Sequence, residues 1–272
     1  MIVQQVLQQL IERRDLTQAE MHAAMMAVMT GEATPAQVGA FLIALRFKGE
    51  TVTEITAAAQ VMRELSSKVS LSVKRKNLVD TCGTGGSGIP LFNISTASAF
   101  VVACAGGFVA KHGNRSVTSK SGSADLLEAA GVNLALAPEQ VAKCVNEIGV
   151  GFMFAVNHHS AMKHAIGPRR DIGVRTIFNV LGPLTNPADA PNQVLGVFDK
   201  NLVRPLAEVL KNLGSEHVLV VHSQDGLDEI SLAAPTFVAE LKNGEISEYS
   251  ITPESLGLKT RPLESLRIDD AK

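Results

Sequence analysis

The sequence predicts an α/β protein, with a small all-helical domain at the N-terminus and a larger domain in which helices flank a mostly parallel sheet. Two observations predict this division. Residues 1–67 carry apolar side chains only at helical spacing, whereas short apolar segments alternate with helical ones from residue 78 onward. Such alternation is typical of a parallel sheet covered on both faces. We expect the helical domain to span residues 1–70 and the α/β domain residues 71–272.

Four helices are predicted in the N-terminal domain. Apolar residues at helical spacing between Val3 and Ile11 indicate the first. Capping boxes at residues 17–20 and 51–54 begin the second and the fourth, and Thr34-Pro35 begins the third. These helices carry an apolar surplus that fits either the core of a bundle or a subunit interface. The surplus consists of Met21, Met25, Met26, Met29, Phe41, Leu42 and Leu45.

The α/β domain is predicted to follow a polar, basic crossover at residues 68–77. Strand-like apolar segments lie at residues 78–79, 108–110, 151–156, 194–198 and 217–222. Helical patterns occupy residues 95–104, 121–130, 138–148 and 202–213. Asn243-Gly244 indicates a hairpin within residues 236–251. Because ligands bind at the carboxyl ends of parallel strands, the loops after the strands are expected to form the site.

Composition narrows the class of protein. The formal net charge of −2 lacks the basic excess of proteins that neutralise nucleic-acid phosphates, so we expect no nucleic-acid partner. Cys82, Cys104 and Cys144 are widely spaced and fit free thiols in a reducing compartment. The N-terminus has no secretory pattern, and the apolar run at residues 97–110 is too short to span a bilayer. We therefore expect a cytoplasmic protein without membrane contact.

The first chemical motif is the loop Gly83-Thr84-Gly85-Gly86-Ser87-Gly88, which follows a predicted strand. Glycines let backbone N–H groups approach an anion, and Ser95 and Thr96 stand where the next helix begins. A flexible turn is the alternative, and no Gly-Lys-Ser/Thr follows as in a Walker loop. The series of strand, glycine loop and hydroxyl-capped helix favours a phosphate site.

The second motif is the loop at residues 111–123, between a predicted strand and a predicted helix. Its cations, Lys111, Arg115 and Lys120, are mixed with hydroxyl side chains, a combination that suits a polyphosphate group. A solvated loop is the alternative, but the density of hydroxyl groups exceeds that of ordinary loops. We interpret this loop as a second phosphate-binding element.

Two further segments carry candidate ligands. Asp228 and Glu229 are adjacent carboxylates after a predicted strand and suit Mg²⁺ that arrives with a phosphate, although such a pair is often only a solvated surface. Residues 157–164 include three histidines without the glutamate of a zinc-protease motif, which favours the wall of a substrate pocket. Arg169 and Arg170 are both suited to bidentate binding of a carboxylate.

Together these motifs resemble the anthranilate phosphoribosyltransferase family, along the whole chain. The resemblance is carried by Gly83-Thr84-Gly85-Gly86, Asn93-Ile94-Ser95-Thr96, Lys111-His112-Gly113-Asn114-Arg115, Ser121-Gly122-Ser123-Ala124-Asp125, residues 175–187 and Gly226-Leu227-Asp228-Glu229. It implies transfer of the phosphoribosyl group of 5-phosphoribosyl 1-pyrophosphate to the amine of anthranilate, in tryptophan biosynthesis. It also implies a homodimer joined through the N-terminal helical domain, and a segment near residues 160–185 that packs with this domain.

The resemblance assigns roles to individual residues. Contacts with phosphoribosyl pyrophosphate are implied for Gly83, Gly86, Asn93, Ser95, Thr96, Lys111, Ser119 and Ser123. Mg²⁺ would be held by Ser95, Asp228 and Glu229, whereas Asn114 and Arg169 would contact anthranilate, Arg169 at the carboxylate. The other predicted substrate-binding residues lie in the same two loops and are Ser87, Leu91, Ile94, His112, Gly113, Arg115, Ser116, Val117 and Thr118. No residue is expected to act as a covalent nucleophile.

The chain departs from the family pattern in its glycine loop and in its length. Ser87 stands where the family usually has an aspartate, and Leu91 where a small polar residue is common, so both are expected to weaken substrate or metal contacts. Family members continue past the position of Lys272, so we expect the C-terminal part of the α/β domain to be missing. Two alternatives stay open, an enzyme like pyrimidine nucleoside phosphorylase, which the acidic pair fits less well, and a catalytically silent homologue that binds nucleic acid.

Overall fold

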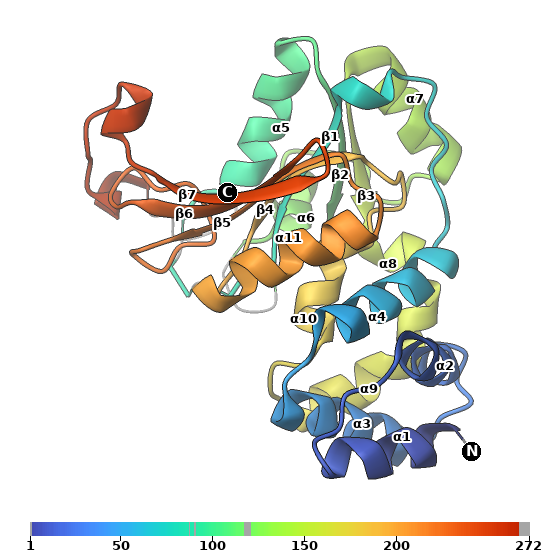
Figure 1. Ribbon diagram of the computed structural model, residues 1–272. Helices are drawn as coiled ribbons and strands as arrows, with labels where there is room; N and C mark the ends of the chain where they lie inside the picture. Colours follow the sequence, from blue (N-terminus) through green and yellow to red (C-terminus); the bar gives the residue numbers. More distant parts are fainter. Residues whose placement is uncertain (1, 87, 90, 117–120, 267–272) are drawn as a thin grey trace. The chain divides into compact units, whose positions relative to one another are not determined.

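The computed structural model describes residues 2–86, 88–89, 91–116 and 121–266, which form two compact units (Figure 1). One unit contains the chain up to Ser67 together with His158–Thr185, and the other contains Lys68–Asn157 together with the chain from Asn186 onward. The first boundary follows Ser67 rather than residue 70, because Val69 already packs into the core of the α/β unit. The helical unit thus draws on two separate stretches of sequence.

The helical unit begins with four helices, whose first residues follow the capping signals in the sequence. Thr17, Thr34 and Thr51 each accept a hydrogen bond from the backbone of the third helical residue and complete a capping box. The later stretch adds α9 and the short α10, which the periodicity of the sequence did not predict. The helices are α1 (Ile2–Ile11), α2 (Gln18–Met29), α3 (Pro35–Lys48), α4 (Val52–Glu64), α9 (Lys163–Ile172) and α10 (Phe178–Leu181).

Most of the apolar surplus of these helices lies inside the unit, so the bundle-core interpretation is correct for most of it. The fully buried side chains are Met21, Met25, Met29, Phe41, Leu42 and Leu45. Another apolar group remains at the surface, because Ile11, Ile43 and Phe47 are 71%, 42% and 72% exposed. The guanidinium of Arg13 lies 4.9 Å from the centroid of the Phe47 ring.

A buried ion pair holds two loops of the helical unit together. Lys48 Nζ donates to Glu54 Oε2 at 2.9 Å, and the side chains are 3% and 0% exposed. Glu54 also accepts hydrogen bonds from the backbone N–H groups of Leu16 and Thr51. Desolvation acts to lower the pKa of Lys48, but Asp15 and Glu54 raise it above its ordinary value. Because the two charges are buried together, the removal of either one alone would destabilise the loops before α2 and α4.

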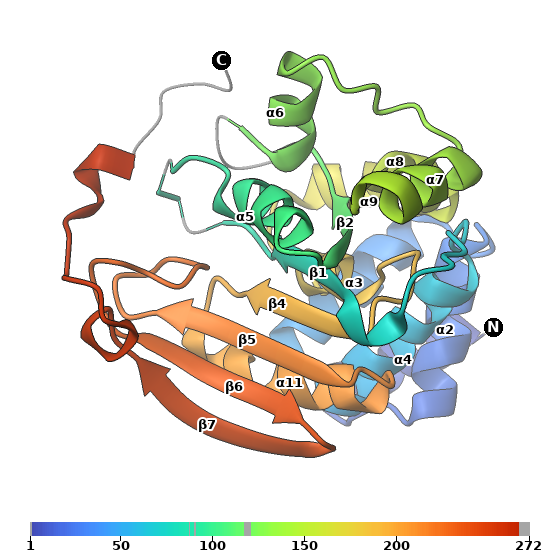
Figure 2. The ribbon, with the colours of Figure 1, turned by 90° about the horizontal axis from the view of Figure 1, so that it is seen from above.

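The α/β unit is built on one sheet in the order β3-β2-β1-β4-β5-β6-β7 (Figure 2). Strands β1 to β5 run parallel, whereas β6 and β7 are antiparallel, which confirms the predicted mostly parallel sheet. Asn243 and Gly244 join β6 to β7 with φ angles of 53° and 79°, as the hairpin signal predicts. The strands are β1 (Leu78–Gly83), β2 (Phe108–Gly113), β3 (Val150–Phe154), β4 (Asn192–Gly196), β5 (His217–Ser223), β6 (Thr236–Lys242) and β7 (Glu245–Ile251).

Each of the five predicted strands has at least one wrong boundary, and polar side chains within strands explain several of the larger differences. β1 continues past Val79 to Gly83, because Asp80 and the residues after it keep pairing with β4. β2 continues past Ala110 to Gly113, because Lys111 and His112 keep pairing with β3. β4 begins two residues earlier than predicted, since the polar Asn192 and Gln193 pair with β1 as well. β3 ends at Phe154 rather than at residue 156, because the chain turns directly into α8 (Ala155–His158).

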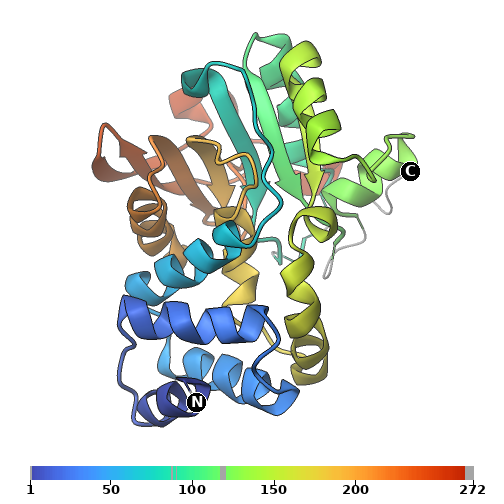
Figure 3. The same ribbon diagram turned by 90° about the vertical axis from the view of Figure 1, so that its right-hand side faces the viewer.

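Helices cover both faces of the parallel strands (Figure 3). On one face lies α7 (Pro138–Ile148), which packs directly against Gly151 of β3. An ideal Cβ on this glycine would stand 2.7 Å from Val145 Cγ2 of α7. Ala110 of β2 pairs with Gly151, and its side chain belongs to the same buried cluster as Val145 of α7. Its neighbour Lys111 points to the other face, where it reaches Ser95 of α5 (Ile94–Cys104). α6 (Ser123–Ala129) follows β2, and α11 (Val203–Asn212) packs beside β5 and β6.

In the described part of the chain, no helix has the length and apolar character needed to cross a membrane.

Candidate active site

The glycine loop begins directly after β1, at the carboxyl edge of the sheet. The N–H of Thr84 donates to the carbonyl of Gly196 at 2.9 Å, which ties the loop to the end of β4. Gly85 and Gly86 have φ angles of 65° and 90°, in the left-handed region that favours glycine. The N–H of Gly85 donates to Asp228 Oδ2 at 3.0 Å. The predicted glycine loop and the predicted acidic pair are therefore in direct contact.

The acidic loop at residues 225–229 can lie this close to the glycine loop because two residues beside it have no side chain. An ideal Cβ on Gly83 would stand 2.9 Å from Asp228 Oδ2, and one on Gly196 would stand 1.7 Å from the Asp228 carbonyl oxygen. Leu227 is 2% exposed and anchors the loop in the core. Asp225 accepts a hydrogen bond from the Ser231 hydroxyl at 2.6 Å, so this carboxylate shapes the loop.

Glu229 and Asp228 form an acidic pair with little compensating charge. Burial, followed by the nearby charge of Asp228, raises the pKa of Glu229 to about 8, although Lys111 acts in the opposite direction. Such a pair fits a divalent cation. Among the described residues there is no group of three His, Cys, Asp or Glu that could hold a metal ion. A cation bound here would therefore take its other oxygen ligands from water or from a substrate phosphate.

Lys111 brings a buried positive charge to the same edge of the sheet. Its side chain lies on β2 and the residue is 2% exposed. Nζ donates to the Thr81 carbonyl and, at 3.1 Å, to the Ser95 hydroxyl. Burial lowers the pKa of Lys111, whereas the negative charges of Asp80 and Glu229 favour its charged form. Ser95, predicted as a metal ligand, thus contacts a cation whose charge acts on Glu229 of the acidic pair.

The first turn of α5 presents a hydroxyl group that no described residue satisfies. Thr96 is 1% exposed, and its Oγ1 has no hydrogen-bond partner in the described part of the chain. A buried hydroxyl without a partner costs about 1–3 kcal/mol. An anion at this helix N-terminus would supply the missing partner. The predicted role of Thr96 in phosphate binding therefore fits its environment.

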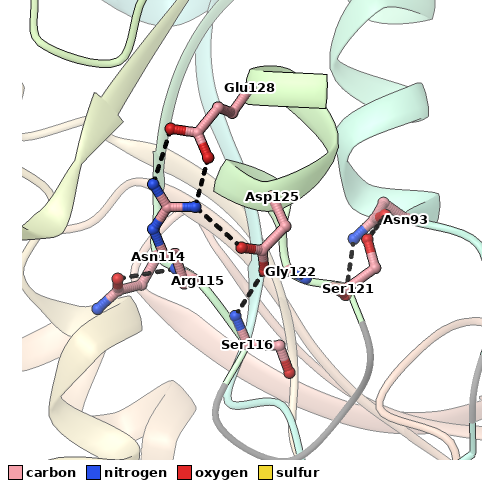
Figure 4. A network of polar contacts seen from close by, with 8 residues as sticks. All are labelled: Asn93, Asn114, Arg115, Ser116, Ser121, Gly122, Asp125 and Glu128. Carbon is pink, nitrogen blue, oxygen red and sulfur yellow. Dashed lines mark hydrogen bonds and ion pairs between the residues drawn. The ribbon is translucent and has the colours of Figure 1, made fainter. Parts of the chain in front are cut away.

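Asn93, which immediately precedes α5, joins the loop before that helix to the second loop (Figure 4). Its Nδ2 donates to the Ser121 carbonyl at 3.2 Å, and the Ser121 hydroxyl donates to its Oδ1 at 3.0 Å. Asn93 makes no capping bond to α5. The structure thus commits its amide to the connection between the loops, and Asn93 reaches the site through Ser121 rather than as a free polar group.

Arg115 is held by two carboxylates of α6 (Figure 4). Its guanidinium donates to both oxygens of Glu128, at 2.7 and 2.8 Å, and to Asp125 at 3.1 Å. Asp125 also accepts hydrogen bonds from the N–H groups of Ser116 and Gly122. The charge of Arg115 is therefore compensated, and this cation supports the loop although the sequence suggested a substrate ligand.

The remaining predicted residues lie around the end of β2 or near the start of α5. His112 is 6% exposed, and an ideal Cβ on Gly113 would stand 3.3 Å from Ser123 Cβ. Asn114 Oδ1 accepts a hydrogen bond from the Arg115 N–H at 2.8 Å. Ile94 is the first residue of α5, and Leu91 lies before this helix as an isolated β-bridge residue. The predictions for Ser87, Val117, Thr118 and Ser119, and the cation Lys120, lie outside the described residues.

Sequence reasoning missed two buried polar residues beside this site. Asp80 is 1% exposed and Asn186 is 4% exposed, and Asn186 Nδ2 donates to Asp80 Oδ2 at 2.8 Å. The available signal was a carboxylate inside an otherwise apolar strand, since a buried charge requires partners. Asn186 gave no comparable signal, because the residues next to it in the sequence do not identify Asp80, its partner 106 residues away.

Arg169 belongs to the helical unit and has an environment that suits a carboxylate ligand. It lies on α9, with its guanidinium 5.0 Å from the centroid of the Phe178 ring. Burial lowers the pKa of Arg169. None of the described acidic residues forms an ion pair with it. A desolvated guanidinium without a counter-charge is ready to bind a planar carboxylate.

Both units match models of a single family. Residues 4–66 match the helical bundle domain of a glycosyl transferase family, and residues 75–272 match its a/b domain. The fold and the site at the carboxyl ends of the strands therefore define a glycosyl transferase.

Individual relatives narrow this class. An anthranilate phosphoribosyltransferase of Marinomonas sp. (strain MWYL1) is 65% identical, over 100% of this chain and 78% of its own length. The crystal structure of the enzyme of that name from Thermus thermophilus is 44% identical with a TM-score of 0.90, over 97% of this chain and 78% of that one. That of Saccharomyces cerevisiae, in complex with PRPP and Mg, is 27% identical with a TM-score of 0.89, over 99% and 78%. The chain belongs to the anthranilate phosphoribosyltransferase family.

Proposed function

We propose that this protein transfers the phosphoribosyl group of 5-phosphoribosyl 1-pyrophosphate to the amine of anthranilate and releases pyrophosphate, as a step of tryptophan biosynthesis. The observation that carries the proposal is the contact between Gly85 and Asp228, which joins an anion-binding loop to an acidic pair. The names of the relatives support the two substrates. The same names favour this reaction over a nucleoside phosphorylase, and the net charge disfavours a nucleic-acid-binding homologue.

The reaction displaces pyrophosphate from C1 of the ribose, so negative charge develops on the leaving group and positive charge on the ribose. Catalysis is then mainly positioning and electrostatic stabilisation. The backbone N–H groups of the glycine loop and the hydroxyl of Thr96 are suited to bind phosphate oxygens. The ammonium of Lys111 is held by Thr81 and Ser95 and stabilises developing negative charge without having to reorganise.

The residues of the acidic pair fit Mg²⁺, which when bound neutralises the negative charge of the pyrophosphate. Asp228 and Glu229 would hold it, together with substrate oxygens. Glu229 must be ionised to do so, which the cation itself favours because it reverses the effect of burial on that carboxylate. The chain's own part is to hold this pair beside Gly85, so that the cation and the anion-binding loop act on one group.

Anthranilate carries a carboxylate next to its amine, and we assign that carboxylate to Arg169. The desolvated guanidinium on the Phe178 ring would fix the acceptor through paired hydrogen bonds. Asn114 is assigned to the same substrate. No general base is required, because an aromatic amine can release its proton to water after it attacks C1.

Anthranilate fluorescence provides the test of this function. We expect the signal to fall only when phosphoribosyl pyrophosphate and Mg²⁺ are both present, with one pyrophosphate released for each anthranilate consumed. A folded protein that leaves the fluorescence unchanged would refute the transfer. Tight, salt-sensitive binding of single-stranded DNA by that protein would favour the nucleic-acid-binding alternative.

We also assign the protein to the cytoplasm and to a homodimer joined through the helical unit. Ile11, Ile43 and Phe47 form an exposed apolar group on α1 and α3, which is suited to a two-fold contact. Sedimentation of the unaltered chain and of Phe47→Glu tests the assembly. We expect a dimer for the former and a monomer for the latter, whereas a monomeric unaltered chain would refute it.

A further inference from the structure

The regular ladder between strands β1 and β2 stops before it reaches the site. Their register pairs run only from Leu78 and Phe108 to Val79 and Val109. β1 nevertheless stays paired with β4 as far as Gly83, and β2 stays paired with β3 as far as Gly113. The interruption of the ladder therefore lies inside a sheet that is continuous on both sides of it.

Side chains bond to three backbone groups at this interruption of the ladder. In a continued parallel ladder, the carbonyl of Ala110 and the N–H of His112 would both pair with the backbone of Thr81. Instead, Asn186 Nδ2 donates to the Ala110 carbonyl at 2.8 Å, and the His112 N–H donates to Asp80 Oδ1 at 3.2 Å. The Thr81 carbonyl accepts its hydrogen bond from Lys111 Nζ.

Asp80 and Asn186 form one buried unit at this interruption of the ladder. Asn186 Nδ2 also donates to Asp80 Oδ2 at 2.8 Å, while its Oδ1 accepts from the Ala188 N–H at 2.8 Å. The amide therefore cannot be turned over without the loss of several hydrogen bonds. Burial raises the pKa of Asp80, and Lys111, Asn186 and the His112 N–H each favour its charged form. The negative charge of Asp80 in turn favours the ammonium form of Lys111.

We infer that Asp80 and Asn186 are positioning residues of the transfer reaction, which hold the backbone of β2 on either side of Lys111 so that its ammonium stays against the Thr81 carbonyl and the Ser95 hydroxyl. The inference rests on the proposed function, because Lys111 is assigned there to the leaving group. Neither residue touches the substrate in this account. Both act by fixing where Lys111 stands.

The test compares two asparagines that each donate to a backbone carbonyl of the sheet. Asn186→Ala removes the amide that donates to the Ala110 carbonyl of β2 at 2.8 Å, whereas Asn192→Ala removes the amide that donates to the Leu78 carbonyl, at the amino end of β1, at 2.8 Å. We expect Asn186→Ala to lower kcat/KM for phosphoribosyl pyrophosphate about tenfold or more, as for the loss of a buried hydrogen-bonding group. KM for anthranilate should change less than about twofold, and Asn192→Ala should keep its kinetic constants.

The role of Lys111 is isolated by repeating Asn186→Ala in a Lys111→Met background. If the asparagine acts through Lys111, its removal there should cost less than about twofold, because effects transmitted through one group do not add. A full tenfold loss in that background, or equal losses in Asn186→Ala and Asn192→Ala, would overturn the inference. Asp80→Asn, which keeps the size of the side chain, repeats the test if Asn186→Ala does not fold.

Calorimetric titration with phosphoribosyl pyrophosphate and Mg²⁺ separates this inference from the proposed function. If the unaltered chain binds the substrate but does not turn it over, only the transfer is refuted. In that case, weaker binding by Asn186→Ala would support the inference. Equal binding by both proteins would overturn the inference and leave the transfer intact. If the unaltered chain neither binds nor turns over the substrate, both are wrong.

Discussion

The carbonyl oxygen of Asp228 lies 1.7 Å from the position of an ideal Cβ on Gly196. Gly196 is the last residue of β4, and its own carbonyl accepts the N–H of Thr84 in the glycine loop. One residue without a side chain therefore lets two loops, which are far apart in the sequence, meet at the edge of the sheet. The meeting point is also where the Gly85 N–H reaches Asp228 Oδ2.

We predict that Gly196→Ala separates these loops. The new methyl group cannot coexist with the Asp228 backbone, so the acidic loop must move, at a cost of about 1–3 kcal/mol or more in the free energy of unfolding. Turnover should fall further than stability explains, and higher Mg²⁺ should be needed for half-maximal rate. Gly182→Ala is the control, because an ideal Cβ there meets nothing within 4 Å. Equal behaviour of the two variants in urea unfolding and in Mg²⁺ titration would contradict the prediction.

Thr96 should show opposite effects on stability and on binding. In Thr96→Val the buried hydroxyl without a partner is lost, so we expect the free energy of unfolding to stay the same or to rise by about 1 kcal/mol. KM for phosphoribosyl pyrophosphate should rise about tenfold, as for the loss of a hydrogen bond to a charged group.

The matched control for Thr96→Val is Thr81→Val, because the Thr81 hydroxyl donates to the Ser95 carbonyl at 2.9 Å. This variant leaves a partnered group unsatisfied and should lower the free energy of unfolding. Thermal unfolding and initial rates measure both effects. A Thr96→Val protein that is clearly destabilised, with an unchanged KM, would show that the hydroxyl serves the fold.

Glu229 should make stability depend on pH between its unfolded and folded pKa values. Burial and the charge of Asp228 raise the pKa of Glu229 to about 8, whereas a glutamate in an unfolded chain titrates near about 4.3. Between these values the folded protein binds the extra proton, so stability falls as pH rises and the penalty is complete above about pH 8. Glu229→Gln should remove this slope, and Mg²⁺ should reduce it in the unaltered chain. Melting temperatures from pH 5 to 9 measure the difference, and parallel curves for the two proteins would refute the assignment.

Much of the fold could be predicted because its signals are local. Thr17, Thr34 and Thr51 each stand next to the helix they cap, and Asn243-Gly244 forms the turn that it indicates. The glycine loop was recognisable because its glycines follow a strand directly. These features depend on residues that are close in sequence, and in each case the local preference agrees with the final structure.

The rest could not be predicted because it depends on partners far along the chain. The link between Asn186 and Asp80 spans 106 residues, and the contact between Gly85 and Asp228 spans 143. Arg115 shows the same dependence, since its cationic loop predicts phosphate binding, whereas its ion pairs with Asp125 and Glu128 become visible only in the fold. Composition indicates which groups are present, but only the fold decides which of them remain available to a ligand.

Arg169 provides a test of the acceptor site by comparison with the residue beside it. Arg169→Gln should raise KM for anthranilate about tenfold to a hundredfold, because a charge-assisted bond to the carboxylate is lost, and KM for phosphoribosyl pyrophosphate should change little. Arg170→Gln is the matched control, since the Arg170 side chain is 82% exposed and pairs at the surface with Asp171. Stability should not fall in Arg169→Gln, because no acidic side chain of the described residues loses a partner. If both variants shift KM for anthranilate equally, or if neither does, the carboxylate is bound elsewhere, and the desolvated guanidinium on Phe178 serves the packing of α9 instead.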